Sequence, residues 1–162
     1  MSESPLNVAI LSGGVGGVKL VEGLYRGAAC DLSIVANTGD DFDHWGLRIC
    51  PDLDTIMYTL AGLADDTRGW GLVDETFACR DAIGQLGGDT WFNLGDRDLA
   101  THLRRTEAMR AGATLTEATA ALNTALGVTA HVVPMTDAPR PTFIETRDGR
   151  RLSFQRWLVQ ER

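Results

Sequence analysis

The stretch ILSGGVGGVKL, residues 10–20, decides how the rest of the chain is interpreted. It joins the apolar run NVAILS, residues 7–12, to a segment whose apolar side chains recur at helical spacing, so a buried strand should lead into a helix. Glycines at such a junction let the backbone approach a ligand closely, and a helix N-terminus favours phosphate. We therefore expect phosphate binding by Gly13, Gly14, Gly16, Gly17 and Lys19, which is the only lysine of the chain.

The glycine spacing matches neither of two familiar phosphate-binding motifs. The pattern G-x-x-x-x-G-K-[ST] does not fit residues 13–20. Gly14 and Gly16 fit the start of G-x-G-x-x-G, but Lys19 occupies the position of the third glycine. A tight turn between strand and helix without any ligand is the alternative interpretation.

The remaining sequence predicts an α/β fold. Strand and helix patterns alternate, which is typical of a Rossmann-like, mainly parallel sheet flanked by helices. Thr114 and Glu117 form a capping box that opens one helix, and Arg147-Asp148-Gly149 marks a β-hairpin formed by residues 141–159. We expect residues 1–162 to form a single α/β domain. The expected elements are strands at 7–12, 31–37 and 128–135, helices at 53–64, 74–86, 98–111 and 115–126, a long loop at 38–52 and a short strand within 90–98.

Composition excludes several classes of protein. A net charge of −7 and a pI of about 4.8 argue against a nucleic-acid-binding face. Three cysteines without a C-x-x-C spacing predict reduced thiols rather than a disulfide framework or a zinc site. No apolar run approaches the ~20 residues of a membrane helix. We expect a soluble, cytoplasmic protein that contacts neither nucleic acid nor membrane.

A first acidic stretch follows the predicted strand at 31–37. Asp40, Asp41 and Asp43 are grouped there with His44 beside them. Grouped carboxylates repel one another unless a cation or an array of donors compensates them, so a hard divalent ion or the hydroxyls and ring N–H groups of a substrate would suit this stretch. A solvated acidic loop is the alternative, and His44 is either a base or part of the polar surface.

Two further acidic stretches lie at predicted helix starts. Asp52 and Asp54 would either cap the helix or hold Mg²⁺ beside phosphate oxygens. In GDRDLATH, residues 95–102, one of the two aspartates would cap the helix, or Arg97 would form an ion pair with an aspartate. Thr101 and His102 follow one helical turn later.

Several long motifs together resemble the 2-phospho-L-lactate transferase (CofD-like) family, whose members act late in the biosynthesis of coenzyme F-420. The resemblance implies transfer of a phospholactyl-type group (phospholactate, phosphoenolpyruvate or phosphoglycerate) from a guanosine diphosphate-linked donor to a hydroxyl of the deazaflavin alcohol Fo. GMP leaves, and Mg²⁺ is the cofactor. The matching stretches are LSGGVGGVKL (11–20), NTGDDFDHWGLRICPDLDT (37–55), DTWFNLGDRDLATH (89–102), VVPMTDAPRPTFIET (132–146) and SFQRWLV (153–159).

The resemblance also implies roles for individual residues. The four glycines and Lys19 would hold the donor phosphates, and Asp52 and Asp54 would carry Mg²⁺, with Asp54 favoured. One aspartate would accept the proton of the Fo hydroxyl, and the catalytic candidates are Asp54, Asp52 and Asp41. The remaining pocket would be lined by Asn37, Asp40 and Asp41 and completed by Asp96, Arg97, Thr101 and His102.

Family members are about twice this length, so the chain is expected to correspond to the amino-terminal half of a longer transferase that forms a homodimer. Two alternatives stay open. An NAD(P)-dependent oxidoreductase would start with the same strand, glycines and helix and would use Asp40 or Asp41 to hold a ribose, but Lys19 counts against it. A non-catalytic regulator that binds nucleotide sugars would need neither the PDLD nor the GDRD stretch.

Overall fold

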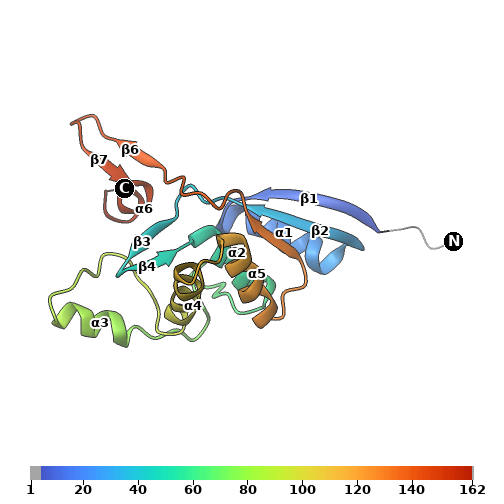
Figure 1. The fold of residues 1–162 in the computed structure, drawn as a ribbon, viewed down its shortest axis with the longest axis horizontal. Helices are drawn as coiled ribbons and strands as arrows, with labels where there is room; N and C mark the ends of the chain where they lie inside the picture. Colours follow the sequence, from blue (N-terminus) through green and yellow to red (C-terminus); the bar gives the residue numbers. More distant parts are fainter. Residues whose placement is uncertain (1–4, 162) are drawn as a thin grey trace.

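A computed structural model describes residues 5–161 and shows a three-stranded parallel sheet at the centre of the chain (Figure 1). The strands are β1 (Leu6–Ser12), β2 (Cys30–Ala36) and β5 (His131–Pro134), in the order β1-β2-β5. Both pairs are parallel, with Leu6 opposite Cys30 and Ser33 opposite His131. The expected Rossmann-like arrangement is therefore confirmed.

Helices cover one face of this sheet (Figure 1). The first layer consists of α1 (Val15–Gly27), α2 (Pro51–Leu60) and α5 (Leu115–Ala125). Helix α4 (Asp98–Arg110) packs on α5 and on the neighbouring hairpin, and the short helix α3 (Ala78–Gln85) lies further out. The main core between the sheet and these helices contains Ile10, Val18, Val21, Leu32, Ile34, Ala36, Leu53, Ile56, Leu115 and Val132.

The segment after β2 differs from its prediction as a loop. It contains an antiparallel hairpin of β3 (Phe42–His44) and β4 (Leu47–Ile49). Trp45 and Gly46 form the turn with φ values of 50° and 74°, and a non-glycine residue with positive φ gives no simple sequence signal. The hairpin is held by a second apolar cluster, because Phe42, Trp45, Leu47 and Ile49 pack with Phe92, Leu94 and Leu99.

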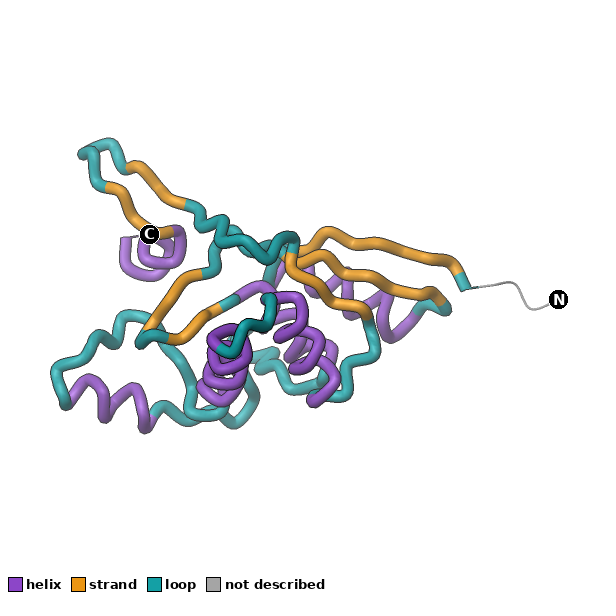
Figure 2. Tube along the Cα trace, in the orientation of Figure 1, coloured by secondary structure: helices purple, strands orange, loops and turns teal. Residues whose placement is uncertain are grey.

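The carboxyl-terminal hairpin is confirmed for its first part only. β6 (Phe143–Glu145) pairs with β7 (Arg151–Ser153), as the Arg147-Asp148-Gly149 turn predicts. The rest of SFQRWLV is not a strand. It forms α6 (Phe154–Arg156) and a π-helical turn (Trp157–Glu161), because Ser153 accepts a hydrogen bond from the Arg156 N–H and caps a helical start. A long loop connects β5 to this unit (Figure 2).

Predictions about helix ends and one short strand are confirmed in part. The capping box of Thr114 and Glu117 is present at α5. Helix α3 starts at Ala78 rather than at residue 74, and residues 90–97 form no strand. Neither α2 nor α4 is capped by the aspartates within it or just before it: Pro51 starts α2, and the Glu75 carboxylate accepts from the N–H groups of Arg97 and Asp98 at the start of α4. Within residues 5–161, the structure has no helix of the length and apolarity that crossing a membrane requires.

Candidate functional site

Five residues meet where β1 and β2 end, α2 starts and α6 packs against them. We call them the glycine-loop cluster: Gly14, Asn37, Asp40, Asp52 and Gln155. Asn37 Nδ2 donates to Asp52 Oδ2 over 2.8 Å and to Asp40 Oδ1 over 3.4 Å. The backbone N–H of Gly14 also donates to Asp52. Gln155 Nε2, from α6, donates to Asp40 Oδ2 over 2.7 Å. Residues from the two ends of the chain therefore meet at this edge of the sheet.

Close packing, rather than an unusual backbone conformation, explains two of the four glycines. Gly13, Gly14, Gly16 and Gly17 all lack positive φ values. A β-carbon on Gly14 would overlap the Asp52 carboxylate, and one on Gly17 would overlap the hydroxyl of Ser12. A β-carbon on Gly16 would meet no atom within 4 Å. Among the four glycines, only at Gly14 and Gly17 would a β-carbon force a neighbouring side-chain oxygen to move.

The carboxyl groups of this region are crowded enough to hold protons unusually tightly. Burial and the nearby Asp52 charge raise the pKa of Asp40 to about 6, against the hydrogen bond from Gln155. Burial raises the pKa of Asp41 to about 7, although the Cys50 thiol donates to it. Burial also raises the pKa of Asp52, against the hydrogen bonds from Asn37 and Gly14. A cation at this point would relieve the cost of ionising these groups.

A cavity of about 480 Å³ opens beside the glycine-loop cluster. Gly14, Asp40 and Asp52 give it a polar end, whereas Trp70 and Phe92 belong to its apolar wall. A second cavity of about 310 Å³ lies between the Asp40–Asp43 stretch and the β6–β7 hairpin, and it also contains Asp40 and Gln155. Asp40 thus stands between two cavities. The apolar wall of the larger one suits a planar ring, whereas the two carboxylates at its polar end would accept phosphate only together with a cation.

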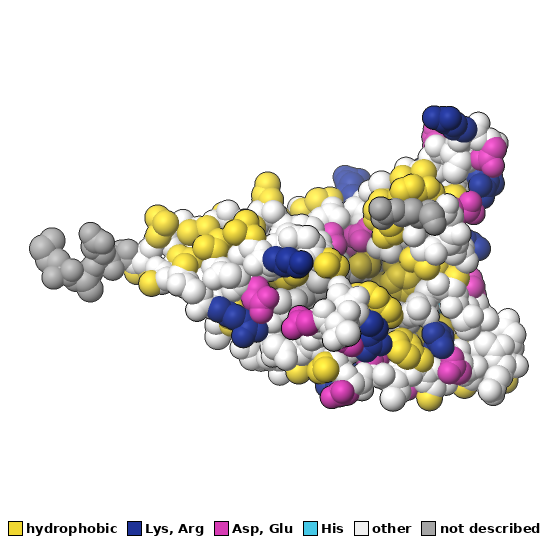
Figure 3. Space-filling view, turned by 180° about the vertical axis from the view of Figure 1, so that it is seen from behind, with side chains coloured by type: hydrophobic (Ala, Val, Ile, Leu, Met, Phe, Trp, Pro, Cys, Tyr) yellow, Lys and Arg dark blue, Asp and Glu magenta, His cyan; other side chains and the backbone are white. Residues whose placement is uncertain are grey.

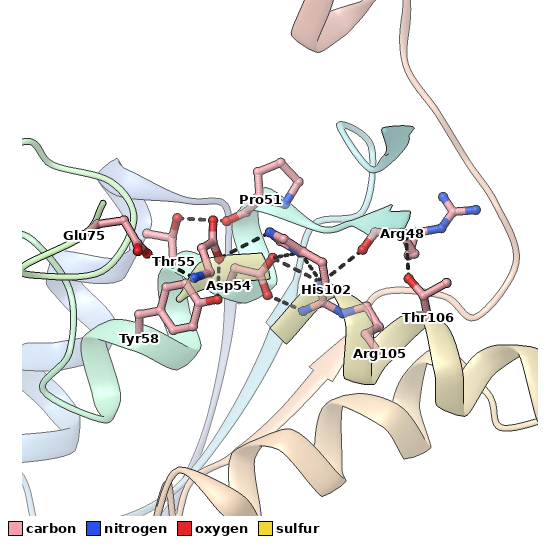
Figure 4. Close-up of polar contacts among 10 residues, drawn as sticks. Arg48, Pro51, Asp54, Thr55, Tyr58, Glu75, His102, Arg105 and Thr106 are labelled. Carbon is pink, nitrogen blue, oxygen red and sulfur yellow. Dashed lines mark hydrogen bonds and ion pairs between the residues drawn. The ribbon is translucent and has the colours of Figure 1, made fainter. Parts of the chain in front are cut away.

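A separate buried network joins α2 to α4 (Figure 4). Both guanidinium Nη atoms of Arg105 donate to Asp54, with an Nη1–Oδ2 distance of 3.1 Å. His102 Nδ1 lies 3.3 Å from Arg105 Nη1, and His102 Nε2 lies 3.2 Å from Asp98 Oδ1. Tyr58 donates its hydroxyl proton to Asp98 over 2.5 Å. Because Arg105 can only donate, His102 Nδ1 is the acceptor in its contact with Arg105, whereas Nε2, although near Asp98, has no hydrogen-bond partner among the described residues.

The charges in this network stabilise one another in a region closed to solvent. Arg105 is 1% exposed. Burial alone would lower the pKa of Arg105, but the adjacent Asp54 carboxylate outweighs burial and raises it. Burial would raise the pKa of Asp98, but the adjacent His102 and the hydrogen bond that the Tyr58 hydroxyl donates outweigh burial and lower it. Burial raises the pKa of Tyr58, as do the nearby Asp54 and Asp98 charges. The network holds α4 against α2.

Comparison with known proteins agrees with the motifs and with the fold. The family model described as "2-phospho-L-lactate transferase CofD" matches residues 8–162. This chain belongs to the CofD family. The phosphoenolpyruvate transferase of Streptomyces coelicolor is 41% identical over 97% of the chain, and that of Nocardia farcinica is 42% identical over 96%.

The chain spans about half the length of these CofD relatives, 51% and 49% respectively. A crystal structure of a UPF0052 family protein from Bacillus halodurans matches 94% of the chain and 46% of its own, with a TM-score of 0.55. Its sequence identity is 15%, so this likeness concerns the fold alone.

The residues predicted to form one site lie in several separate parts of the structure. Asn37, Asp40 and Asp52 meet in the glycine-loop cluster, together with Gly14. Gly13 adjoins the cluster, because its β-carbon position would lie 3.5 Å from Asp52 Oδ2. Asp54 lies apart in its ion pair with Arg105, so Asp52 and Asp54 do not share a site here. Among residues 5–161, no group of three or more His, Cys, Asp and Glu side chains is placed to hold a metal ion.

The remaining expected residues have separate surroundings. Asp96 accepts hydrogen bonds from Thr76 and from the N–H groups at the start of α3. Arg97 is exposed and donates to the Val73 carbonyl oxygen. Lys19 is exposed and lines a smaller cavity that shares Val15, Thr55 and Trp70 with the large one. Thr101 hydrogen-bonds Tyr58, beside His102. Asp41 lies next to Cys50, and its Oδ1 atom has no protein partner among the described residues.

Sequence reasoning missed four residues that shape this region. Gln155 was expected in a strand, yet it is buried and binds Asp40. Arg105 could have been found, because Asp98, His102 and Arg105 recur at i, i+4 and i+7 on one helix face. Trp70 and Phe92 come from irregular segments, and no local pattern assigns them to a cavity wall.

Proposed function

We propose that this chain provides the phosphate-binding half of a transferase of coenzyme F-420 biosynthesis. The reaction moves a phosphoenolpyruvyl group from a guanosine diphosphate-linked donor to the hydroxyl of Fo and releases GMP. The observation that carries the proposal is the glycine-loop cluster, in which crowded carboxylates face a glycine-rich helix start at the end of a parallel sheet. Membership of the CofD family, and relatives named phosphoenolpyruvate transferases, support the choice of reaction.

In this proposal the donor phosphates bind at the start of α1. Gly13 and Gly14 have no side chains to exclude phosphate oxygens, and the first N–H groups of α1 lack helical partners. Lys19 is exposed one turn further along the helix and adds a positive charge from the neighbouring cavity. Transfer of a phosphoryl group depends mainly on positioning and on neutralising charge, which backbone N–H groups and a cation supply.

The residues present fit a magnesium ion held largely by substrate. Mg²⁺ commonly binds one or two carboxylates together with phosphate oxygens and water, and Asp52 is the carboxylate closest to the glycines. Bound there, the ion would neutralise phosphate charge. Asn37 orients Asp52 through its amide. A metal role for Asp54 would require its pair with Arg105 to open, and this role stays a prediction.

Asp40 is suited to accept the proton of the Fo hydroxyl. Its pKa of about 6 leaves it mainly ionised near neutral pH while keeping it a better base than an ordinary carboxylate. Gln155 fixes one of its oxygens, and Asp40 lines both cavities. Asp41 has a pKa of about 7 but is more deeply buried, and it is the second candidate for this role.

The test joins this chain to the carboxyl-terminal half of the Streptomyces coelicolor phosphoenolpyruvate transferase. The fusion receives Fo, Mg²⁺ and a donor in which one diphosphate joins guanosine to enolpyruvate, and the products are measured by mass spectrometry. We expect equal amounts of GMP and phosphoenolpyruvyl-Fo, and a loss of rate of at least 100-fold in Asp40→Asn, within the range that a general base contributes. A folded fusion that makes neither product, while NADH stabilises the chain against heat, would instead support the oxidoreductase alternative.

A further inference from the structure

Glu75 lies in the segment before α3, yet its carboxylate holds the start of α4. Its Oε1 atom accepts a hydrogen bond from the Arg97 N–H over 2.8 Å, and its Oε2 atom accepts one from the Asp98 N–H over 3.0 Å. The first N–H groups of a helix lack partners within the helix, and a negative charge is favoured there. Figure 4 shows Glu75 beside the buried network that joins α2 to α4. Glu75 therefore caps α4 from a distant part of the sequence.

A glycine makes room for this carboxylate. Gly95 is buried, and a β-carbon at this position would overlap the Glu75 side chain. The φ value of Gly95 is not positive, so space rather than backbone conformation requires a glycine here. Gly95 and Glu75 thus repeat the relationship between Gly14 and Asp52, in which a glycine lies against a carboxylate that accepts a backbone N–H.

The contact is reciprocal, because Asp96 caps α3. The Asp96 carboxylate accepts hydrogen bonds from the Thr76 hydroxyl over 2.6 Å and from the first N–H groups of α3 over 2.9 and 3.0 Å. The Asp96 N–H in turn donates to the Thr76 carbonyl oxygen over 2.8 Å. We call these mutual contacts of residues 75–79 with residues 95–98 the capping clasp. Each of its two segments fixes the helix that follows the other.

The capping clasp connects two walls of a cavity. The segment that leads into it carries Trp70, and Arg97 also holds this segment by donating to the Val73 carbonyl oxygen. A cavity of about 80 Å³ is lined by Trp70 on one side and by Asp98 and His102 of α4 on the other, and Trp70 also lines the cavity of about 480 Å³. On the face shown in Figure 3, hydrophobic side chains gather between the arm that carries β6 and β7 and the helical part of the molecule. The clasp thus sets how far Trp70 lies from the start of α4.

We propose that Glu75 is a positioning residue for the planar ring of the acceptor. This inference rests on the proposed function, because it takes that ring to be the deazaflavin of Fo. Glu75 acts through Trp70, whose segment it fixes against α4, so the aromatic wall keeps one spacing from the polar side chains of that helix. The glycine-loop cluster lies on other elements, so binding of phosphate should not depend on Glu75.

The test compares two ligands in one variant. Glu75→Gln keeps the size of the side chain, but its amide nitrogen cannot accept a hydrogen bond from an N–H of α4. Fluorescence titration should show that Fo binds at least about fivefold more weakly, within the range of a lost helix cap, whereas calorimetry should show unchanged binding of GDP with Mg²⁺. Asp74→Asn is the control, because Asp74 is an exposed neighbouring carboxylate, and it should change neither affinity. Unchanged Fo affinity in Glu75→Gln would overturn the proposal, as would an equal loss of both affinities.

Gly95→Ala tests the same contact from the other side. The added β-carbon should displace the Glu75 carboxylate and weaken Fo binding as Glu75→Gln does. In a Glu75→Ala background the β-carbon has room, so Gly95→Ala should cause no further loss of affinity. Losses that simply add in the double variant would mean that the two residues act independently, which contradicts the capping clasp.

Amide hydrogen exchange keeps this inference separate from the proposed function. If the wild-type chain binds GDP but not Fo, the acceptor of the proposed function is wrong, and the role of Glu75 is decided by exchange of residues 67–77. Exchange of this segment should be at least about tenfold faster in Glu75→Gln than in wild type and in Asp74→Asn. Equal exchange in all three proteins would show that Glu75 does not hold the segment that carries Trp70.

Discussion

The carboxylate of Asp52 occupies the space that a β-carbon on residue 14 would need. Gly14 and Asp52 come from different elements, the start of α1 and the first turn of α2, and the Gly14 N–H donates to Asp52. In the proposed function, the start of α1 that would bind phosphate and the carboxylate that would hold Mg²⁺ are thereby side by side. The contact also gives a packing reason for glycine at residue 14.

Gly14→Ala should therefore displace Asp52 and weaken binding of GDP with Mg²⁺ by tenfold or more. Gly16→Ala is the matched control, because a β-carbon there meets no atom within 4 Å and alanine favours helix by about 0.5–1 kcal/mol. Calorimetric titration measures the affinity, and thermal unfolding of both variants reports on the fold. Equal affinity in the two alanine variants would show that the contact between Gly14 and Asp52 does not position the site.

The Asp54–Arg105 pair should matter far more for stability than a surface pair on the same helix. Arg105→Met leaves the Asp54 carboxylate buried without its partner, and we expect the free energy of unfolding to fall by about 3–5 kcal/mol. Arg104→Met is the control, because its pair with Glu107 is exposed to solvent and contributes little. Urea unfolding measures both variants. A similar, small effect of the two substitutions would mean that Arg105 is not the partner that Asp54 requires.

Replacing both Asp54 and Arg105 distinguishes a role of Asp54 in folding stability from a role in the reaction. Asp54→Leu combined with Arg105→Met removes both charges, so most of the stability lost in Arg105→Met should return. Restored folding with activity retained in the fusion would assign Asp54 a positioning role through α4. Restored folding without activity would support the metal role expected from the sequence.

The crowded carboxyl groups predict an unusual dependence of stability on pH. Asp41 has a pKa of about 7 in the folded chain and an ordinary value of 3.8, so the folded state holds the proton more tightly than the unfolded state does. The contribution of Asp41 to stability is therefore greatest below pH 3.8 and is lost as the pH rises towards 7, by up to about 1.4 kcal/mol per pH unit. Asp41→Asn should flatten this slope, whereas Asp31→Asn, at an exposed position, should leave it unchanged. Urea unfolding from pH 4 to 8 measures the slope, and an unchanged slope in Asp41→Asn would contradict the assignment.

The apolar wall of the large cavity should bind the deazaflavin ring of Fo. Trp70→Ala removes a surface for stacking, and because such contacts contribute about 1–3 kcal/mol per ring, we expect Fo to bind at least fivefold more weakly. Trp70→Phe keeps an aromatic face and should restore most of the affinity. Fluorescence titration with Fo measures both, and unchanged affinity in Trp70→Ala would place the ring elsewhere.

Regular elements could be predicted from the sequence because their apolar residues repeat with the period of a strand or a helix. β1, β2, α1 and α5 follow such patterns closely. The β3–β4 hairpin could not be predicted, because its strands have three residues each and its turn uses Trp45 with a positive φ. Its stability comes instead from distant partners such as Phe92 and Leu94, which local sequence does not reveal.

The candidate site was predictable as a set of residues but not as a geometry. Gly14, Asn37, Asp40 and Asp52 were all candidate site residues, and the structure brings them together, while their roles stay predictions. The motifs did not separate Asp52 from Asp54, since two residues on a helix turn face different sides and only the position of α4 decides which one meets Arg105. Gln155 lies 115 residues from Asp40 in sequence, and only the folded chain brings the two together.

Binding of GDP to the wild-type chain and to Asp52→Asn, with and without Mg²⁺, shows whether the glycine-loop cluster holds the ion beside the phosphates. Calorimetric titration should show that Mg²⁺ strengthens GDP binding to the wild type at least tenfold. The same addition should have little effect on Asp52→Asn, while Asp31→Asn should behave as the wild type. Equal strengthening by Mg²⁺ in the wild type and in a folded Asp52→Asn variant would contradict the account, because the glycine-loop cluster would then not hold the ion beside the phosphates.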